Sequence, residues 1–426
     1  MREDLLHFIW KNNKLRGKSL ATEKGQPIEV YQSGTLNLFA GPDFFNAKLN
    51  IGGQVWAGNV EMHIKSSDWY IHGHEADLRY NNVILHVVWE NDVEVFRKDG
   101  SSIPVLELKT IVDKEFLNSY NNLLRNTKKS FINCESQLLQ IDSFIIKNWQ
   151  ERLYIERLQD KSALLFQLLE DSQNDWEKVL FCMLLKNFGL NRNGNAFLEL
   201  GKAIDFSIIR KVAPNILQLE ALLLGVSGLL DGLEGVHSYE KQLINEYNFL
   251  KIKFQLKSQV AKPEFFGLRP SNFPTIRLAQ LAQLYHKTQN IFRKVITDGA
   301  GVDTSVFKEV AASDYWNTHY NFGKVSTHRR KKISKTFIDL LVINTLIPVK
   351  FAYQKHLGKL QPEVLIVQMR SLSSEKNTIN TNYKNLGVPV ENALDSQANL
   401  QLYHKYCVKN KCLQCALGHQ LLRRNS

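Results

Sequence analysis

Polar and apolar residues alternate along two neighbouring stretches near the start of the chain. Residues 48–52 (KLNIG) and 55–64 (VWAGNVEMHI) switch between the two classes at most positions, which is typical of strands with one buried face. The pair Gly52-Gly53 between them is a two-residue hairpin signal. The pattern therefore predicts two antiparallel strands joined by a tight turn.

The residues on either side of this hairpin predict a mixed unit of one helix and several strands. Apolar positions in Arg2–Lys14 recur at helical spacing. Downstream, Val93–Phe96 and Val105–Leu108 are expected to pair as strands around the turn Lys98-Asp99-Gly100. The first 110 or so residues thus combine one helix with five or six strands.

The apolar spacing changes to three and four residues after Asp113, which indicates helices for most of the remaining chain. We therefore expect an α+β protein. A mixed α/β sheet unit over residues 1–112 would precede a large α-helical domain over residues 113–400, and a cysteine-rich segment over residues 401–426 would end the chain.

The composition is that of a soluble, positively charged protein. Of the 426 residues, 44% are hydrophobic and 23% are charged, and the formal net charge is +12 with an isoelectric point near 9.3. A basic chain attracts polyanions, so nucleic acid is the expected partner. No apolar run in the sequence approaches membrane-spanning length, so no membrane partner is expected. The sequence leaves the oligomeric state open.

The cysteines and the N-terminus predict a cytoplasmic location. The chain has five cysteines, an odd number, and three of them are crowded near the C-terminus, which fits a reducing compartment better than a disulfide framework. The first residues, MREDLLHFIWKNN, lack the apolar core of a secretory signal.

The predicted hairpin also carries the residue types that metal chemistry needs. Alternation places Glu61 and His63 on one face of the second strand, and Asp43 lies just before the first strand. Antiparallel neighbours therefore bring Asp43, Glu61 and His63 close together, where oxygen and nitrogen ligands can hold a metal. The alternative is a structural role, in which these side chains are only hydrogen bonded on a surface hairpin.

Histidines are dense in the same region, because four of the twelve lie between His63 and His86. His72-Gly73-His74 falls in a predicted loop, whereas His86 is inside the apolar run Val83–Trp89. A histidine in such a run is expected to be buried and to need a hydrogen-bond partner.

Segments spread over nearly the whole chain resemble an uncharacterised bacterial family known as domain of unknown function 2851. The matching segments are GPDFFNAKLNI, GNVEMHIKSSDWYIHGH, YNNVILHVV, NFGLNRNGNAF, EALLLGVSGLL, LRPSNFPTIRLAQLAQL, LVINTLIPV and YCVKNKCLQCALG. The chain is identified as a member of this family, and the resemblance implies no particular activity.

The N-terminal part also resembles, more distantly, the PD-(D/E)XK nucleases. Pro42-Asp43 matches the PD of their motif and Glu61 its second acid, while His63 stands where the family usually has a lysine. Glu3 matches the acid that the first helix often contributes. The histidine and the segment WYIHGH are similar to very-short-patch repair endonucleases. This resemblance implies a restriction-endonuclease-like sheet in the N-terminal unit.

The resemblance also implies a mechanism. Asp43 and Glu61 would hold Mg²⁺ or Mn²⁺, and the metal would neutralise charge on the attacked phosphate and lower the pKa of a bound water. His63, or Lys65 on the same face, would orient that water or accept its proton.

Other residues widen the choice of metal and site. His72 or His74 would protonate the leaving oxygen, and with so much imidazole nearby Zn²⁺ is also a suitable occupant. A second acid-x-lysine triplet, Glu107-Leu108-Lys109, ranks behind because few polar residues surround it.

A second metal site is predicted from the pattern Cys407-x4-Cys412-x2-Cys415. Three thiols within nine residues of a cytoplasmic chain can wrap one metal centre. His419 would complete a Cys₃His zinc site. Cys134 would instead tie the chain's end to the nuclease-like part, as iron–sulfur centres do in some members of that superfamily. Zn²⁺ and a [4Fe–4S] cluster are both candidates, and the alternative is three free thiols packed on a helix.

A basic run, Lys324–Lys335 (KVSTHRRKKISK), is the predicted nucleic-acid contact. Tyr315, Trp316 and Tyr320 precede it and could stack on bases. The alternative is a solvated loop without a partner. The residues expected to contact nucleic acid are His328, Arg329, Arg330, Lys331 and Lys332.

Together these features predict a metal-dependent, nuclease-like protein that hydrolyses phosphodiester bonds in nucleic acid. The alternative is a non-catalytic nucleic-acid-binding or scaffold protein whose histidine and aspartate cluster is structural. A hydrolase of a smaller phosphate or nucleotide would share the metal site and enclose it in a pocket. The positions of Asp43, Glu61 and His63 relative to one another separate these alternatives.

Overall fold

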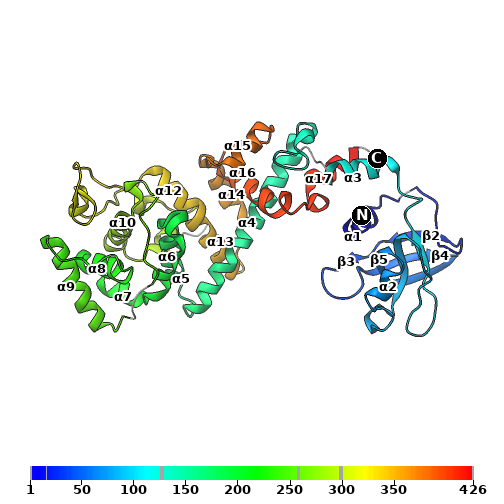
Figure 1. Cartoon of the computed structure of the whole chain (residues 1–426), viewed down its shortest axis with the longest axis horizontal. Helices are drawn as coiled ribbons and strands as arrows, with labels where there is room; N and C mark the ends of the chain where they lie inside the picture. Colours follow the sequence, from blue (N-terminus) through cyan, green and yellow to red (C-terminus); the bar gives the residue numbers. More distant parts are fainter. Residues whose placement is uncertain (1, 16, 125–128, 257–259, 297–300, 425–426) are drawn as a thin grey trace. The chain divides into compact units, whose positions relative to one another are not determined.

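Two glycines join the longest strands of the protein. In the computed structural model, β4 (Phe44–Ile51) and β5 (Gln54–Lys65) are antiparallel, and Ile51 pairs with Gln54 across the turn. Gly52 and Gly53 between them have φ angles of +61° and +90°, which a two-residue hairpin requires and which glycine adopts without strain. The predicted hairpin is therefore confirmed. The structure describes residues 2–15, 17–124, 129–256, 260–296 and 301–424 (Figure 1).

The hairpin is the centre of a seven-stranded sheet with the order β1-β2-β4-β5-β6-β7, in which β3 also pairs with β4. The strands from β1 to β5 are antiparallel to their neighbours, whereas β5, β6 and β7 are parallel. The chain crosses from β5 to β6 through α2 and η1. The bounds of these elements are β1 (Leu20–Ala21), β2 (Pro27–Gln32), β3 (Thr35–Leu36), α2 (Asp68–Ile71), η1 (Leu78–Tyr80), β6 (Val83–Glu90) and β7 (Val105–Glu107).

One predicted strand pairing is wrong. Val105–Glu107 does not pair with Val93–Phe96 but extends the sheet in parallel beside β6. The predicted turn does form, because Gly100 donates its backbone N–H to the carbonyl of Arg97, and Phe96 faces Ser102 in an isolated bridge. The first six residues of β6 are buried, so the backbone groups on both edges of this strand need hydrogen-bond partners. β5 pairs with one edge and β7 with the other.

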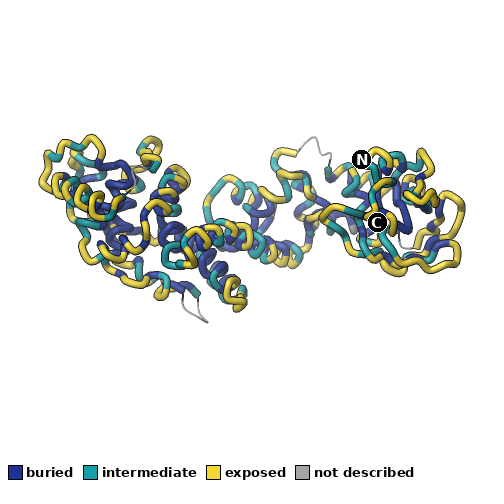
Figure 2. The backbone as a smooth tube through the Cα atoms, turned by 90° about the horizontal axis from the view of Figure 1, so that it is seen from below, coloured by how far each residue is buried: buried dark blue, intermediate teal, exposed yellow. Residues whose placement is uncertain are grey.

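The N-terminal helix covers the sheet near β5. It runs over α1 (Glu3–Lys11), shorter at both ends than the predicted Arg2–Lys14, and its apolar stripe includes the fully buried Leu5, Leu6 and Ile9. Figure 2 shows the buried stretches of the backbone in dark blue and the exposed ones in yellow. The packing fixes which face of α1 points toward the ends of β4 and β5.

The chain forms two compact units. Unit 1 contains residues 1–149, 385–388 and 402–426, and unit 2 contains residues 150–384 and 389–401. The sequence instead places boundaries after residues 112 and 400. The difference arises because the C-terminal residues and the segment after the sheet pack with the N-terminal part. The additional elements of unit 1 are α3 (Lys114–Leu124), η2 (Glu135–Gln140), the π-helix η7 (Leu402–Cys407), η8 (Cys412–Gln414) and α17 (Ala416–Arg424).

Contacts at the N-terminus hold α17 in unit 1. The rings of Phe8 and His419 lie edge to face with centroids 4.8 Å apart, and Lys14 Nζ donates to the carbonyl of Leu422 at 3.4 Å. The helix also packs against α3. The last helix is thus part of the same core as the first.

Unit 2 is helical apart from a two-stranded sheet, and its largest helix contacts are α5 with α6 and α8 with α9. Its helices are α4 (Ser143–Asp171), α5 (Trp176–Phe188), α6 (Leu190–Ala203), α7 (Phe206–Val212), α8 (Ile216–Val226), α9 (Ser238–Lys253), η3 (Pro270–Asn272), α10 (Pro274–Lys287), α11 (Ile291–Val295), η4 (Ser305–Phe307), η5 (Asp314–Asn317), α12 (Lys335–Leu341), the π-helix η6 (Val342–Leu346), α13 (Ile347–His356), α14 (Pro362–Ser371), α15 (Thr378–Asn385) and α16 (Ala393–Gln401), and its strands are β8 (His319–Asn321) and β9 (Lys324–Val325). The α+β class is confirmed.

One helical span in the described chain is long and apolar enough to cross a membrane. It covers Lys335–His356, with a mean hydropathy of 1.4 over its most apolar window, and 67% of that window is buried inside the protein. This degree of burial is the environment of a core helix rather than of a lipid-facing one. The sequence predicts a helix over Thr336–Gln354, within this span, but no apolar run of membrane-spanning length.

Candidate metal centre

Glu61 and His63 lie side by side on one face of β5, because residues two apart in a strand point to the same side. Both side chains are buried, with relative exposures of 5% and 2%, whereas Met62 between them points into the opposite face of the sheet. Buried polar groups of this kind require partners. Each of the two has several.

The carboxyl groups of Glu61 and Asp43 each accept a backbone N–H from the neighbouring segment, Glu61 from Asp43 and Asp43 from Met62. The N–H of Asp43 donates to Oε2 of Glu61 at 3.0 Å, and the N–H of Met62 donates to Oδ2 of Asp43 at 3.0 Å. The two carboxyl groups are therefore held side by side. The predicted convergence of Asp43, Glu61 and His63 is present in the structure.

Helix α1 adds two further groups to the same place. Nε2 of His7 lies 3.1 Å from Oδ2 of Asp43. Glu3 is one helical turn earlier on the same face, and its pKa is raised by partial burial and by the charge of Asp43. Glu3 was predicted from the sequence, whereas His7 was not. Their i,i+4 spacing was an available signal.

The segment after β5 places two more histidines, His72 and His74, next to Glu61 and His63. Nε2 of His63 is 3.1 Å from Nδ1 of His72 and 3.6 Å from Oε1 of Glu61, and Nε2 of His74 is 3.3 Å from the same Glu61 oxygen. One ring nitrogen from each of His63, His72 and His74 lies within 4.8 Å of the other two. The three histidines thus form a group of nitrogen donors, and Glu61 lies beside two of them, His63 and His74.

The separations match those around a tetrahedral metal. A zinc ion with bonds of about 2.0–2.1 Å places its ligand atoms about 3.3 Å apart. Three distances in the site are close to this value: 3.1 Å from His63 Nε2 to His72 Nδ1, and 3.3 and 3.6 Å from Oε1 of Glu61 to Nε2 of His74 and of His63. The three imidazoles fit Zn²⁺ better than Mg²⁺, which prefers oxygen ligands.

His86 supports the site from beneath. Its Nε2 is 2.8 Å from Nδ1 of His63, on the side of the ring opposite the nitrogen that faces His72. The side chain is fully buried, and its own Nδ1 has no hydrogen-bond partner among the described residues. The expectation that His86 is buried with a partner is confirmed.

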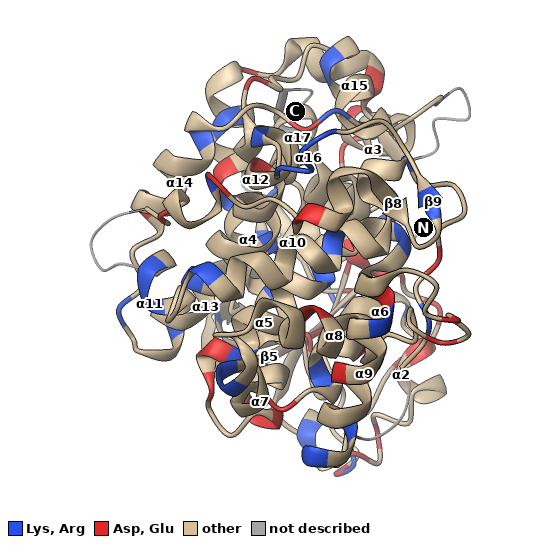
Figure 3. Cartoon of the chain, turned by 90° about the vertical axis from the view of Figure 1, so that its left-hand side faces the viewer, with Lys and Arg blue, Asp and Glu red and all other residues tan. Residues whose placement is uncertain are grey.

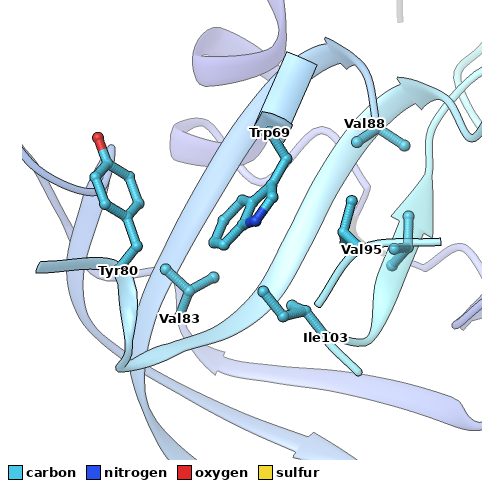
Figure 4. Close-up of a cluster of buried hydrophobic side chains, with 7 residues drawn as sticks. Trp69, Tyr80, Val83, Val88, Val95 and Ile103 are labelled. Atoms are coloured by element: carbon cyan, nitrogen blue, oxygen red, sulfur yellow. The ribbon is translucent and has the colours of Figure 1, made fainter. Parts of the chain in front are cut away.

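An apolar cluster next to β6 fixes the loop that carries His72 and His74. The indole of Trp69 is fully buried between Val83, Val88 and Ile103, as Figure 4 shows. The His74 ring stacks on Tyr80 with centroids 3.8 Å apart, and it meets Trp69 edge to face. The packing orients His74 before any metal is bound.

Burial keeps these groups uncharged at neutral pH. Burial, and then the charge of Asp43, raise the pKa of Glu61 to about 9. Burial lowers the pKa of His63 to about 2 and of His86 to about 3, with neighbouring histidines adding to both shifts, and it also lowers the pKa of His74. Neutral imidazoles are the form that binds a metal. A cation close to the buried carboxyl of Glu61 would stabilise the ionised form of that group.

Two predicted groups lie away from the cluster. The Lys65 side chain is exposed at the end of β5, with Nζ 3.9 Å from Oδ2 of Asp92. In the second triplet, Nζ of Lys109 lies 3.2 Å from Oε2 of Glu90, and Glu107 ends β7. Neither lysine contacts the group of histidines.

The four predicted cysteine ligands line one cavity in unit 1. Cys134, Cys407, Cys412 and Cys415 surround it together with mostly apolar side chains. Burial and the other three thiols raise the pKa of Cys134. His419 does not line this cavity. Its Nε2 lies 2.5 Å from the carbonyl of Leu413.

The basic run in unit 2 is only partly available to a ligand. His328, Arg329 and Arg330 are exposed, but Lys331 is buried, with Nζ donating to the carbonyl of Asn317 at 2.9 Å. Nζ of Lys332 pairs with Glu309 at 2.6 Å. Figure 3 shows basic residues in blue and acidic residues in red interspersed over the helices.

The aromatic residues before this run belong to the core. Trp316 is fully buried, and the ring of Tyr315 is stacked between Tyr239 and His319, at centroid distances of 4.4 and 4.1 Å. The ring of Tyr320 faces Nζ of Lys331 at 4.0 Å. The expectation that these aromatics offer free faces to bases is wrong for Tyr315 and Trp316, because protein groups already cover them.

The fold and site together define an α+β protein in which three histidines and two acids meet at the central hairpin of a mixed sheet. The chain belongs to the family described as Protein of unknown function (DUF2851), whose model matches residues 3–378. This confirms the family predicted from the sequence. A search of curated proteins found no match, and neither did a search of solved structures.

Proposed function

We propose that unit 1 is a metal-dependent phosphodiesterase that acts on nucleic acid, with Zn²⁺ held by His63, His72 and His74. The observation that carries the proposal is the spacing of their ring nitrogens, within 4.8 Å of one another beside a buried carboxyl. Three histidines leave the fourth position of a tetrahedral zinc ion for water or a phosphate oxygen.

The carboxyl groups then act on the bound water. Oε1 of Glu61 lies 3.3 Å from Nε2 of His74, and beside a zinc ion held by the three histidines it would accept a proton from the water that the metal activates. Asp43 and His7 lie next to it with about a quarter of each side chain exposed, 23% and 24%, so protons can leave toward solvent. The roles differ from those predicted from the sequence, because the histidines are ligands and the acids handle protons.

The arrangement of elements supports the resemblance to PD-(D/E)XK nucleases. An aspartate precedes one strand, Glu61 and His63 lie on the next, and the first helix places Glu3 beside them. The net charge of +12 and the exposed His328, Arg329 and Arg330 favour a polyanionic substrate.

A second function is supported by one observation. Oε1 of Glu61 lies where a fourth ligand would complete a closed, structural zinc site, 3.3 and 3.6 Å from Nε2 of His74 and His63. In that case unit 1 would be a non-catalytic binding or scaffold module.

Glu61→Gln separates the two functions. The full-length protein is freed of metal with a chelator, loaded with Zn²⁺, Mn²⁺ or Mg²⁺, and incubated with single- and double-stranded DNA, RNA and bis(p-nitrophenyl) phosphate. If Glu61 is the base, the variant keeps its zinc affinity and loses at least roughly 100-fold in rate. If Glu61 is a ligand, the zinc affinity falls.

A matched control is His356→Ala, which removes an exposed histidine at the end of α13 in unit 2. This variant should keep wild-type zinc content and rate. The catalytic proposal fails if zinc-loaded wild-type protein cleaves none of these substrates, or if Glu61→Gln cleaves them as fast as wild type.

A further inference from the structure

The cysteine cavity of unit 1 brings together two parts of the chain that are far apart in sequence. Cys134 lies just before η2, whereas Cys407, Cys412 and Cys415 lie on and around η7 and η8 near the C-terminus. All four line the same cavity, and Cys134, Cys412 and Cys415 are buried in it. The remaining lining is mostly apolar and comes from Leu123, Ile132, Leu402, Tyr406 and Leu417, with Asn133 and Gly418.

The thiols are spaced too widely for one zinc ion. Around a single Zn²⁺ with bonds of about 2.3 Å, four sulfurs lie about 3.8 Å from one another. Within the described part of the chain, the group of three donors within 4.8 Å of one another is that of His63, His72 and His74, and no three cysteine sulfurs meet this limit. An iron–sulfur cubane separates its four thiolates more widely, because each binds a different iron atom.

The surroundings provide hydrogen bonds to sulfur. Nδ2 of Asn133 donates to Sγ of Cys412 at 3.6 Å, and the backbone N–H groups of Leu417 and Gly418 point at the thiol of Cys415. Cys415 directly precedes α17, so its sulfur faces the positive end of that helix. Such N–H donors stabilise thiolate sulfur and set the reduction potential of iron–sulfur clusters.

Gly418 allows this approach. A Cβ atom at this position would lie 2.1 Å from the carbonyl oxygen of Cys412, closer than any side chain tolerates. The turn that carries Cys412 and the first turn of α17 therefore pack backbone to backbone. This keeps Cys412 and Cys415 on the same wall of the cavity.

We propose that Cys134, Cys407, Cys412 and Cys415 bind a [4Fe–4S] cluster. The cluster occupies the apolar cavity of unit 1 and links the segment after the sheet to the C-terminal helix. His419 is not a ligand, because its ring lies against Phe8 and the carbonyl of Leu413. The proposal is independent of the zinc site, which uses other residues.

The full-length protein, purified without oxygen, tests the proposal directly. We expect four iron atoms and four acid-labile sulfides per chain, together with the broad visible absorption of a cubane, which bleaches on reduction with dithionite. Protein that loses its cluster during purification is reconstituted with ferrous iron and sulfide. Stoichiometric zinc in place of iron, or failure to take up iron and sulfide on reconstitution, overturns the proposal.

Variants identify the ligands. Cys134→Ser and Cys412→Ser should each lose most of the iron, whereas Cys182→Ser and His419→Ala should keep it. Cys182 is a matched control because it is a buried cysteine in α5 of unit 2. If Cys134→Ser keeps the full iron content, or His419→Ala loses it, the assignment of the four ligands is wrong. The wild-type iron and sulfide content decides the proposal even if a cysteine variant fails to fold.

Discussion

The imidazole rings of His63 and His86 are hydrogen bonded to each other inside the sheet, with Nδ1 of His63 2.8 Å from Nε2 of His86. The bond couples the proton positions of the two rings. If Nε2 of His63 binds a metal, Nδ1 carries the proton and donates it to His86. In that case His86 would orient a metal ligand without contacting the metal.

Replacing His86 should weaken metal binding. We expect His86→Leu to lower the zinc affinity by roughly 10–100-fold, the usual effect of removing a hydrogen-bond partner of a histidine ligand. Competition with a chromophoric chelator measures the change, and His356→Ala serves as the control. An unchanged affinity in a variant with wild-type circular dichroism would show that His63 is not a ligand through Nε2.

Glu61 should destabilise the metal-free protein at neutral and alkaline pH. Its pKa is raised from 4.5 to about 9, so folding favours its neutral form, and the resulting loss of stability is absent below pH 4.5 and grows as the pH rises toward 9. Metal-free Glu61→Gln should therefore have a higher midpoint of urea unfolding than wild type at pH 8. The difference should shrink toward pH 4.5. A variant less stable than wild type at pH 8 would contradict the raised pKa.

Metal binding at neutral pH should release protons. Glu61 is protonated in the metal-free protein at pH 7 because its pKa is about 9, and a cation beside it favours the ionised form. Calorimetric titration of zinc in buffers of different ionisation enthalpy measures the number of protons released. We expect about one proton more from wild type than from Glu61→Gln. Equal release would place Glu61 outside the influence of the metal.

The basic run should divide into contact residues and structural residues. Arg329→Ala and Arg330→Ala should weaken nucleic-acid binding with little change in stability. Each should also reduce the slope of log affinity against log salt concentration by about 1. Lys331→Ala should instead destabilise unit 2 by about 1–3 kcal/mol, because it removes a buried donor to the carbonyl of Asn317. Fluorescence anisotropy against salt concentration and thermal unfolding separate the two effects. The reverse pattern would show that Lys331 is released to bind.

Trp69 should matter for both stability and the site. Trp69→Ala removes a fully buried indole from the cluster beside β6 and should cost about 3–5 kcal/mol. Trp69→Phe should retain much of this stability while losing the bond from Nε1 to the carbonyl of Phe96, 3.2 Å long. Chemical unfolding followed by circular dichroism measures both. A cost below 1 kcal/mol for Trp69→Ala would show that this cluster is not part of the core.

Local patterns predicted the hairpin and the residues on it. Alternation with a period of two set Glu61 and His63 on one face, and Gly52-Gly53 set the register with the strand after Asp43. The pairing of Val105–Glu107 was missed, because its parallel partner β6 lies across a long connection rather than across a turn.

The groups that come from other elements were harder to predict. His7 reaches Asp43 only because the apolar stripe of α1 packs on the sheet, and no local pattern states the angle of that packing. Lys331 and Arg330 look alike in the sequence. One is buried over the ring of Tyr320 and the other is exposed, which depends on the surrounding fold.

Unit 1 includes residues from both ends of the chain, since α17 packs with α1 and α3 and Cys134 shares a cavity with three late cysteines. Synthesis on the ribosome delivers these parts at very different times. The sheet and α1 emerge first, but α17, which packs against α3 and against Phe8 of α1, is complete only when the last residues are translated. Unit 2 can therefore finish folding before unit 1 does. A chain whose translation stops before residue 402 would therefore leave the ribosome without α17 and without three of the four cysteines of the cavity.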